Sequence, residues 1–330
     1  MISLRFTLAG LAWVLGISGA IAAESRVPWR NTRLVGSPDP PSEFVVVRAY
    51  TGVRLKRPVA IEREPGGSRL FVLENHAWDV YTSVLKAMAD DPGTSDVETL
   101  LEIPGRSEVA YSLCFHPGYG ENGYIYIGSN GVGPADKHHS RVVRYTVPRE
   151  AGRPIDPASA QTIIEWPSNG HNGAGVTFGS DGYLYVTSGD GTPHGDAGLA
   201  GQDTGSLLAK VLRMDVDGAP PGQPYRVPED NPFVGRDGIR PETWAYGMRN
   251  PWRIAHDAES GQTWVGENGQ DLREYAHLIR RGANYGWSEY EGTRVYQAGR
   301  LRGPAPVTPP TLEHDHAVFR SLTGGFVYRG

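Results

Sequence analysis

The sequence has 330 residues, of which 39% are hydrophobic, and its formal net charge is −5. It has no block of clustered Lys and Arg, which argues against a nucleic-acid partner, because phosphate contacts need basic side chains gathered on one face. Cys114 is the one cysteine, so an intrachain disulfide and a cysteine-built metal site are excluded.

The first 22 residues are typical of a secretory signal peptide. Arg5 gives a positive start, Phe6 to Ile21 is an apolar run, and small residues stand at the expected cleavage site. The run is too short and wrongly flanked for a membrane anchor. We therefore expect a signal peptide over 1–22, a lead-in segment over 23–54 and a periplasmic or secreted protein without stable membrane insertion.

A repeat follows along the chain. An apolar stretch leads to a turn with Gly, Asp or Asn and then to a short strand with a central aromatic residue. The four copies are Val59–Asn75, Leu113–Asn130, Val176–Asp190 and Ile254–Asn268. Together with 43 Gly and 26 Pro, repeats of this kind at roughly 60-residue spacing predict the blades of an all-β propeller. The central aromatics are Phe71, Tyr126, Tyr185 and Trp264.

Further half-buried strands are expected between these copies. They are Glu98–Ile103, Arg141–Val147, Gln161–Trp166 and Ala209–Val216. Helical periodicity is scarce, and Tyr81–Ala89 is the best helical candidate, as an inserted excursion. A fifth copy begins at Gly324–Tyr328, and since a propeller closes by joining its last blade to its first, we expect the chain to stop before its last one or two blades.

Polar residues end the same strand in each copy. They are Glu74-Asn75, Ser129-Asn130, Asp190 and Glu267-Asn268. Each taken singly is typical of an ordinary turn. Because equivalent strand ends of a propeller converge on one rim, together they predict a shared polar site.

The densest polar segment is Ser168–Gly175, in which His171 stands among glycines. Glycines let a ligand approach the backbone closely, and an imidazole suits general-base work near neutral pH. Asp190, at the end of the next strand, would orient this ring. The alternative is a histidine that belongs to a turn.

A second cluster, Trp244–Trp252, holds Arg249 and Asn250 between aromatic residues. The guanidinium is a planar, permanently charged fork for carboxylate or quinone oxygens. A buried structural arginine is the alternative.

A third cluster, Gly266–Glu274, gathers oxygen ligands such as Glu274 in a glycine-containing loop, as calcium prefers, but without EF-hand spacing. A solvated loop is the alternative. The pairs His138-His139 and His314–His316 are further metal candidates, again with a solvated loop as the alternative.

Five motifs resemble the soluble glucose/sorbosone (aldose sugar) dehydrogenase family, in that family's order and spacing. They are His171–Asp190, Leu207–Asp215, Asp230–Phe233, Trp244–Pro251 and Ala283–Trp287. The likeness covers roughly Leu55 to Gly330, which makes 55–330 the propeller domain.

The resemblance implies a six-bladed propeller that binds pyrroloquinoline quinone (PQQ) with calcium and oxidises an aldose or related sugar at its C1 hydroxyl. His171 would remove the hydroxyl proton while hydride passes to the quinone, with Asp190 assisting. Arg249 and Asn250 would hold the quinone, and Arg249 would belong to the catalytic group as well. The implied partners are a small sugar and an external electron acceptor.

The resemblance also assigns the calcium ligands. The backbone carbonyls of Gly269 and Gln270 would reach the cofactor's calcium, with Glu274 as the acidic candidate nearby. The family's late basic residues, which grip the quinone carboxylates, are expected beyond Gly330, and Arg329 is the candidate match within the chain.

Three departures concern sugar recognition. Gly170 stands where the glucose enzymes have an acidic residue, and Ser107 and Glu108 occupy the region of a family glutamine. The family's Gly-Pro calcium step is Gly269-Gln270 here. Two alternatives stay open: a non-catalytic propeller that binds a partner, and a calcium-dependent propeller lactonase.

Overall fold

The computed structural model describes residues 45, 47–76, 82–150, 152–300 and 302–329. Its contacts divide the chain into two units, Met1–Arg48 and Ala49–Gly330, and every element named below belongs to the second. The predicted signal peptide lies outside the described residues. Within the described ranges, no helix has the length and apolar character needed to cross a membrane.

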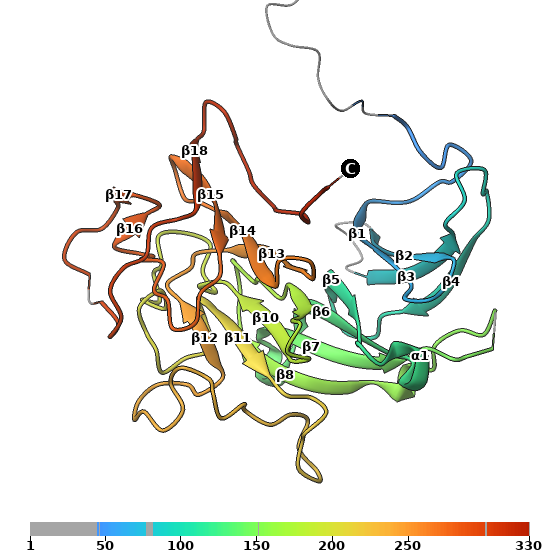
Figure 1. The fold of residues 1–330 in the computed structure, drawn as a ribbon, viewed down its shortest axis with the longest axis horizontal. Coiled ribbons are helices and arrows are strands. Elements are labelled where there is room, and N and C mark those ends of the chain that lie inside the picture. Colours follow the sequence, from blue (N-terminus) through green and yellow to red (C-terminus); the bar gives the residue numbers. More distant parts are fainter. Residues whose placement is uncertain (1–44, 46, 77–81, 151, 301, 330) are drawn as a thin grey trace, which may run out of the picture. The chain divides into compact units, whose positions relative to one another are not determined.

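Four antiparallel sheets of four strands each form the main framework of the described part of this unit (Figure 1). The first contains β1 (Pro58–Arg63), β2 (Arg69–His76), β3 (Thr82–Ala89) and β4 (Val97–Glu102). The second contains β5 (Val109–Phe115), β6 (Tyr124–Val132), β7 (His138–Thr146) and β8 (Gln161–Pro167). The third contains β9 (Val176–Phe178), β10 (Leu184–Ser188), β11 (Lys210–Met214) and β12 (Thr243–Tyr246).

The fourth sheet is interrupted by a long excursion. It contains β13 (Pro251–Asp257), β14 (Gln262–Asn268), β15 (Arg273–Leu278) and β18 (Leu312–Asp315). Between its last two strands lies a two-stranded ribbon of β16 (Tyr290–Glu291) and β17 (Arg294–Val295). The described helices are short: α1 (Tyr119–Asn122) and the 3-10 turns Pro134–Asp136 and Pro157–Ser159.

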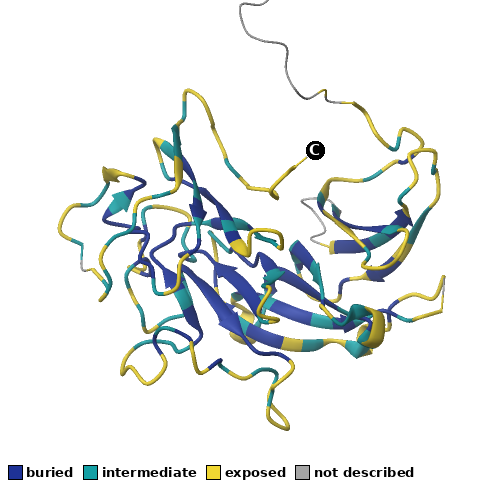
Figure 2. Cartoon of the chain, in the orientation of Figure 1, coloured by how far each residue is buried: buried dark blue, intermediate teal, exposed yellow. Residues whose placement is uncertain are grey.

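The sheets are arranged as propeller blades. Their first strands contact one another in succession, β1 with β5, β5 with β9 and β9 with β13. Apolar side chains fill the spaces between neighbouring sheets; Leu73 and Leu113 belong to one buried cluster, and Val142 and Val186 to the next. Figure 2 shows the buried strands against exposed turns. The all-β propeller predicted from the repeat is therefore confirmed.

The predicted repeat matches the first two strands of every sheet. Each central aromatic lies on the second strand, and Phe71, Tyr126 and Tyr185 are buried there, while Trp264 is half-buried. The four additional predicted strands correspond to β4, β7, β8 and β11, with ends shifted by a few residues.

Three expectations differ from the structure. Thr82–Ala89 is strand β3 rather than a helix, because it pairs with both β2 and β4 and so lies inside a sheet; Tyr81 is outside the described residues. Gly324–Tyr328 forms no strand in the described chain. The described residues form four blades, so the count of six rests on the family resemblance alone.

Four turns of the third and fourth sheets lie at the same end, because successive strands run in opposite directions. In an antiparallel meander, the turn before the first strand and the turn after the second strand lie at the same end. In the third and fourth sheets these turns are 168–175, 189–209, 247–250 and 269–272. We call this end of the two sheets the site end, and it carries all three predicted polar clusters.

Candidate active site

His171 and Asp190 form a direct pair at the site end. His171 Nδ1 lies 2.8 Å from Asp190 Oδ1. The Asp190 side chain is fully buried, whereas that of His171 is 11% exposed. A carboxylate only accepts hydrogen bonds, so Nδ1 is the donor in this pair, and in the neutral ring the lone pair then lies on Nε2. The predicted orientation of the histidine by the aspartate is thus present.

Asp190 is held by further donors. Thr192 donates to Oδ1 from its backbone N–H at 3.0 Å and from its hydroxyl at 3.2 Å. The indole Nε1 of Trp287 donates to Oδ2 at 2.8 Å. These donors compensate the carboxylate for its lost hydration, as a buried anion requires.

A backbone hydrogen bond joins this pair to the arginine cluster. The N–H of Asp190 donates to the carbonyl oxygen of Arg249 at 2.8 Å. The turn 189–209 of the third sheet is therefore fixed directly to the turn 247–250, which leads into the fourth sheet. The structure thus brings His171, Asp190 and Arg249 to adjoining turns at the site end.

Two glycines permit the loops around His171 to approach closely. A Cβ on Gly189 would lie 2.2 Å from the carbonyl oxygen of His171, and a Cβ on Gly170 would lie 2.4 Å from the carbonyl carbon of Thr192. Such contacts are too short for any side chain with this backbone. The position of Gly170 therefore has no room for an acidic side chain unless the backbone of Thr192 shifts.

The second sheet reaches the same site through amides. Asn130, at the end of the β6 segment predicted to be polar, donates to Asn172 Oδ1 at 3.2 Å. Asn172 in turn donates to the hydroxyl of Tyr111 at 3.0 Å. The polar strand ends of the second, third and fourth sheets thus meet at one rim, while Glu74 pairs with Lys86 inside the first sheet.

Arg249 is a buried cation, only 7% exposed. Its Nε donates to Gln270 Oε1 at 2.9 Å and its Nη1 to the Asn268 carbonyl at 3.1 Å, and its guanidinium carbon lies 5.8 Å from the Trp287 ring centre. Among the described residues no carboxylate forms an ion pair with it. A buried guanidinium with neutral partners is chemically suited to receive an anion.

The neighbours of Arg249 fix its main chain. Its backbone N–H donates to Glu267 Oε1, and Glu267 Oε2 lies 2.7 Å from His277 Nε2, with both of these side chains buried. Asn250 Nδ2 lies 3.5 Å from Asn268 Oδ1, at the limit of a hydrogen bond. The amide of Asn250 is therefore only loosely committed within the protein.

The predicted calcium residues fall into two groups. Gly269 and Gln270 form the tip of the β14–β15 hairpin beside Arg249. Glu274 is instead occupied, accepting from Leu322 N at 2.7 Å and Asn268 Nδ2 at 3.2 Å and lying 3.0 Å from His316 Nε2. Within the described ranges, no group of three or more His, Cys, Asp or Glu side chains could hold a metal.

Comparison with protein families shows which family this chain matches. Residues 110–324 match the family described as Glucose / Sorbosone dehydrogenase. The chain belongs to this family.

Solved and curated relatives agree with membership of the glucose/sorbosone dehydrogenase family. A PQQ-bound aldose sugar dehydrogenase from Streptomyces coelicolor is 26% identical with a TM-score of 0.60, over 82% of this chain and 71% of that one. "Aldose sugar dehydrogenase YliI" of Escherichia coli is 31% identical over 39% of this chain and 33% of its own length.

A relative with a different name is also similar. The "Hedgehog-interacting protein" of Homo sapiens is 30% identical over 87% of this chain and 40% of its own length. The chain therefore spans less than half the length of either curated relative. Similarity to this chain thus extends to a protein whose name describes binding rather than catalysis.

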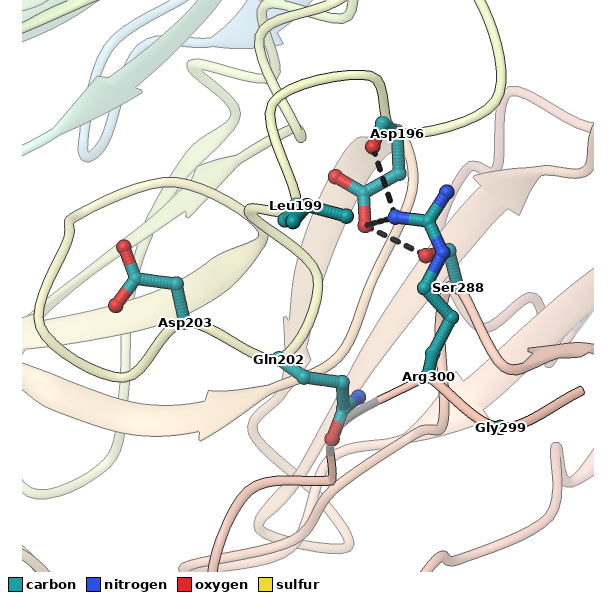
Figure 3. Close-up of a pocket in the computed structure, with 7 residues that line it drawn as sticks. All are labelled: Asp196, Leu199, Gln202, Asp203, Ser288, Gly299 and Arg300. Carbon is teal, nitrogen blue, oxygen red and sulfur yellow. Dashed lines mark hydrogen bonds and ion pairs between the residues drawn. The ribbon is translucent and has the colours of Figure 1, made fainter. Parts of the chain in front are cut away.

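A cavity of about 450 Å³ lies beside the site of this family member (Figure 3). Asp196 accepts from Ser288 Oγ at 2.6 Å, and Arg300 donates to the Asp196 carbonyl at 3.3 Å. Burial raises the pKa of the Asp196 carboxyl above its ordinary value, and the charge of Asp190 adds to this. Neither His171 nor Arg249 lines the cavity, so its volume alone does not mark the reacting centre.

Several contacts of the site have no signal in the sequence. Trp287 and Glu291 lie in the 279–311 excursion, which returns to the site end where Trp287 N donates to the Gly247 carbonyl at 2.9 Å. Trp287 belongs to a family motif, but the motif did not indicate which residue its side chain would contact. Glu291 stands outside all five motifs, so nothing local could have identified it.

Glu108 and Arg329, two further positions considered in the sequence, form ion pairs within the protein. Glu108, in the region of the family glutamine, is buried and accepts from Ser129 Oγ at 2.5 Å and Arg141 Nη1 at 2.7 Å. Arg329 pairs with Asp257, at the turn that joins the first two strands of the fourth sheet and so lies at the end opposite the site. Arg329 therefore does not match a quinone-gripping residue.

Proposed function

We propose that this protein is a PQQ-dependent dehydrogenase that oxidises an aldose or related sugar at its C1 hydroxyl. The C1 hydrogen would leave as hydride to the quinone, the hydroxyl proton would pass to the protein, and a lactone would be released. The observation that carries the proposal is the His171–Asp190 pair joined through the backbone to Arg249, a buried cation with no acidic partner among the described residues.

His171 is proposed as the general base. Asp190 accepts the Nδ1 proton, so Nε2 is the atom that takes the proton of the C1 hydroxyl. The imidazolium that results would be stabilised by the buried Asp190 carboxylate. Exposure of 11% leaves the ring accessible to a small substrate while most of its surface is packed.

The chain's residues fit an anionic planar cofactor. Arg249 offers charge without an internal anion, and Asn250 has an amide that is barely used. Bound PQQ would supply the hydride acceptor, with its calcium as Lewis acid. We propose that Gly269 and Gln270 contribute carbonyl oxygens to that calcium, whereas Glu274 would first have to release its protein donors.

The sugar is proposed to differ from glucose in how it is held. Gly170 leaves no room for the acidic neighbour of the glucose enzymes, and Glu108 is engaged by Arg141 and Ser129. We also propose six blades in the whole protein, an external electron acceptor, and export by the segment 1–22; these rest on the family and on the leader sequence.

The test is dye-linked oxidation of an aldose panel by the purified chain with calcium and PQQ. His171→Ala should lower kcat at least about a hundredfold, the usual contribution of a general base. His194→Ala, at an exposed histidine of the neighbouring turn, should leave kcat within about twofold. If PQQ binds and no sugar is oxidised, or if both variants behave alike, the proposed activity is wrong.

A non-catalytic binding role is the second candidate, because the human Hedgehog-interacting protein resembles this chain over 87% of the length of this chain. Calorimetric titration with PQQ and calcium separates the two. Heat of binding with a change in the quinone absorbance supports the dehydrogenase, and the absence of both supports the binding role. Lactone turnover with calcium alone, without quinone, would instead indicate a lactonase.

A further inference from the structure

One carboxylate oxygen organises the tip of the β14–β15 hairpin. Glu291 Oε1 accepts the backbone N–H groups of four consecutive residues, at 2.9, 2.7, 2.8 and 3.1 Å in chain order. The four donors are Gln270, Asp271, Leu272 and Arg273. Glu291 is 2% exposed, and among the described residues no Lys, Arg or His forms an ion pair with it. Successive amides that converge on an anion form a nest, which replaces the water that the carboxylate loses.

The nest determines where the carbonyl groups of the same loop point. A peptide unit is planar and trans, so the C=O of one residue points opposite to the N–H of the next. The N–H of Gln270 shares its peptide with the Gly269 carbonyl, and the N–H of Asp271 shares its peptide with the Gln270 carbonyl. Both carbonyl oxygens therefore point away from Glu291.

These two carbonyl oxygens are also unused. Between described residues, no hydrogen bond has the carbonyl of Gly269 or Gln270 as its acceptor. The loop is nonetheless tight, since a Cβ on Gly269 would lie 1.6 Å from the Arg273 carbonyl oxygen. A rigid turn that presents two free carbonyl oxygens on one side has the ligand chemistry of a hard cation such as calcium.

The same loop is tied to the arginine of the site. Gln270 Oε1 accepts from Arg249 Nε at 2.9 Å and from Gly195 N at 3.2 Å. A displacement of the loop would therefore move the partner of Arg249 as well as the two carbonyls. Glu291 sits behind this arrangement and contacts neither His171 nor Asp190 by any hydrogen bond between described residues.

We propose that Glu291 is a positioning residue that fixes the 269–273 loop so that the Gly269 and Gln270 carbonyls face a calcium ion. The inference rests on the proposed function for the identity of the cation. The peptide dipoles of the loop are aligned, with their N–H ends toward the Glu291 carboxylate and their C=O ends toward the cation. Removing the negative charge of Glu291 therefore weakens cation binding.

The test compares Glu291→Gln with Glu289→Gln, using calcium alone without quinone. Glu289 is a buried carboxylate two residues earlier in the same segment, and it pairs with Arg302 instead of with the loop. Calcium affinity is measured by calorimetric titration, and the exposure of amides 270–273 by hydrogen exchange in the metal-free protein. Glutamine keeps the shape of the side chain and one oxygen acceptor.

We expect Glu291→Gln to speed exchange of amides 270–273 and to weaken calcium binding by at least about tenfold, as the loss of a charge-assisted hydrogen bond does. Glu289→Gln should stay within about twofold in both measurements. Unchanged calcium affinity in Glu291→Gln, or no calcium binding by the wild type, overturns the inference.

A second measurement covers the case in which Glu291→Gln does not fold. In the wild type, calcium should slow exchange at amides 270–273 more than elsewhere in the chain, and a protection pattern that omits this loop overturns the inference. Because no sugar and no quinone are present, a failure of sugar oxidation leaves these results unaffected and the two outcomes distinguishable.

Discussion

At the scale of single residues, both carboxylate oxygens of Asp190 are engaged within the site. One oxygen orients His171 and the other receives the Trp287 indole, while the side chain has no exposure to solvent. In such a dry environment each donor has a large influence on how strongly the carboxylate attracts a proton on the imidazole.

Trp287→Phe tests this influence. The variant keeps an aromatic ring but removes the donor to Asp190 Oδ2, so the carboxylate attracts the imidazolium proton more strongly. We expect the acidic limb of the pH profile of kcat/KM for sugar oxidation to move to higher pH and kcat/KM to fall about tenfold. Trp166→Phe is the matched control, since that buried indole has no hydrogen-bond partner among the described residues. An acidic limb that stays in place would refute the argument.

At the scale of elements, the spacing between sheets depends on residues without side chains. A Cβ on Gly128 of β6 would lie 1.8 Å from the carbonyl oxygen of Ala174, in the loop that carries His171. Neighbouring blades also share a direct bond, from Val176 N to Ser112 Oγ at 3.1 Å. The second sheet therefore helps to define where the His171 loop of the third sheet lies.

Gly128→Ala should force the second sheet and the His171 loop apart. Overpacking of this kind typically costs about 1–3 kcal/mol, so we expect a lower melting temperature together with reduced sugar oxidation. Gly120→Ala, in α1, is the control, because a Cβ there has nothing within 4 Å. Circular dichroism melts of both variants provide the measurement, and equal melting temperatures would contradict the argument.

The strands could be predicted from the sequence more fully than the contacts between them. The repeat predicted the first two strands of each sheet, because alternation and turn residues act locally. The prediction of a helix was wrong at Thr82–Ala89. This segment pairs with a strand on each side and is therefore a strand itself. His171 and Asp190 could be paired, because the turn before the first strand of a blade and the turn after its second strand lie at the same end. The contacts of Trp287 and Glu291 could not, since they depend on how a long excursion folds back in three dimensions.

At the scale of the whole molecule, one buried amine links stability to pH. Lys210 on β11 has no solvent exposure, and its Nζ donates to the carbonyls of Asp203 at 2.6 Å and Leu208 at 2.7 Å. Burial lowers the pKa of Lys210 to about 7, although the charges of Asp203 and Asp196 act in the opposite direction. An unfolded lysine keeps its ordinary pKa of about 10.5.

The sign of the pH effect follows from these two values. Between pH of about 7 and 10.5 the unfolded chain holds a proton on Lys210 that the folded chain lacks, so the free energy of unfolding rises with pH, by up to about 1.4 kcal/mol per pH unit. Lys210→Met should flatten this rise, whereas Lys137→Met, at an exposed lysine, should preserve it. Thermal melts across this range provide the measurement, and identical pH curves for the two variants would refute the assignment.

The bond from the Asp190 amide to the Arg249 carbonyl has a consequence for how such a site can diversify. Neither partner is a side chain, so a substitution at either position leaves the donor and the acceptor in place, apart from proline at position 190, which lacks the N–H. The join between the turns 189–209 and 247–250 is thus not removed by exchanging either side chain. Side chains around these two turns can therefore change while the backbone connection between them is kept.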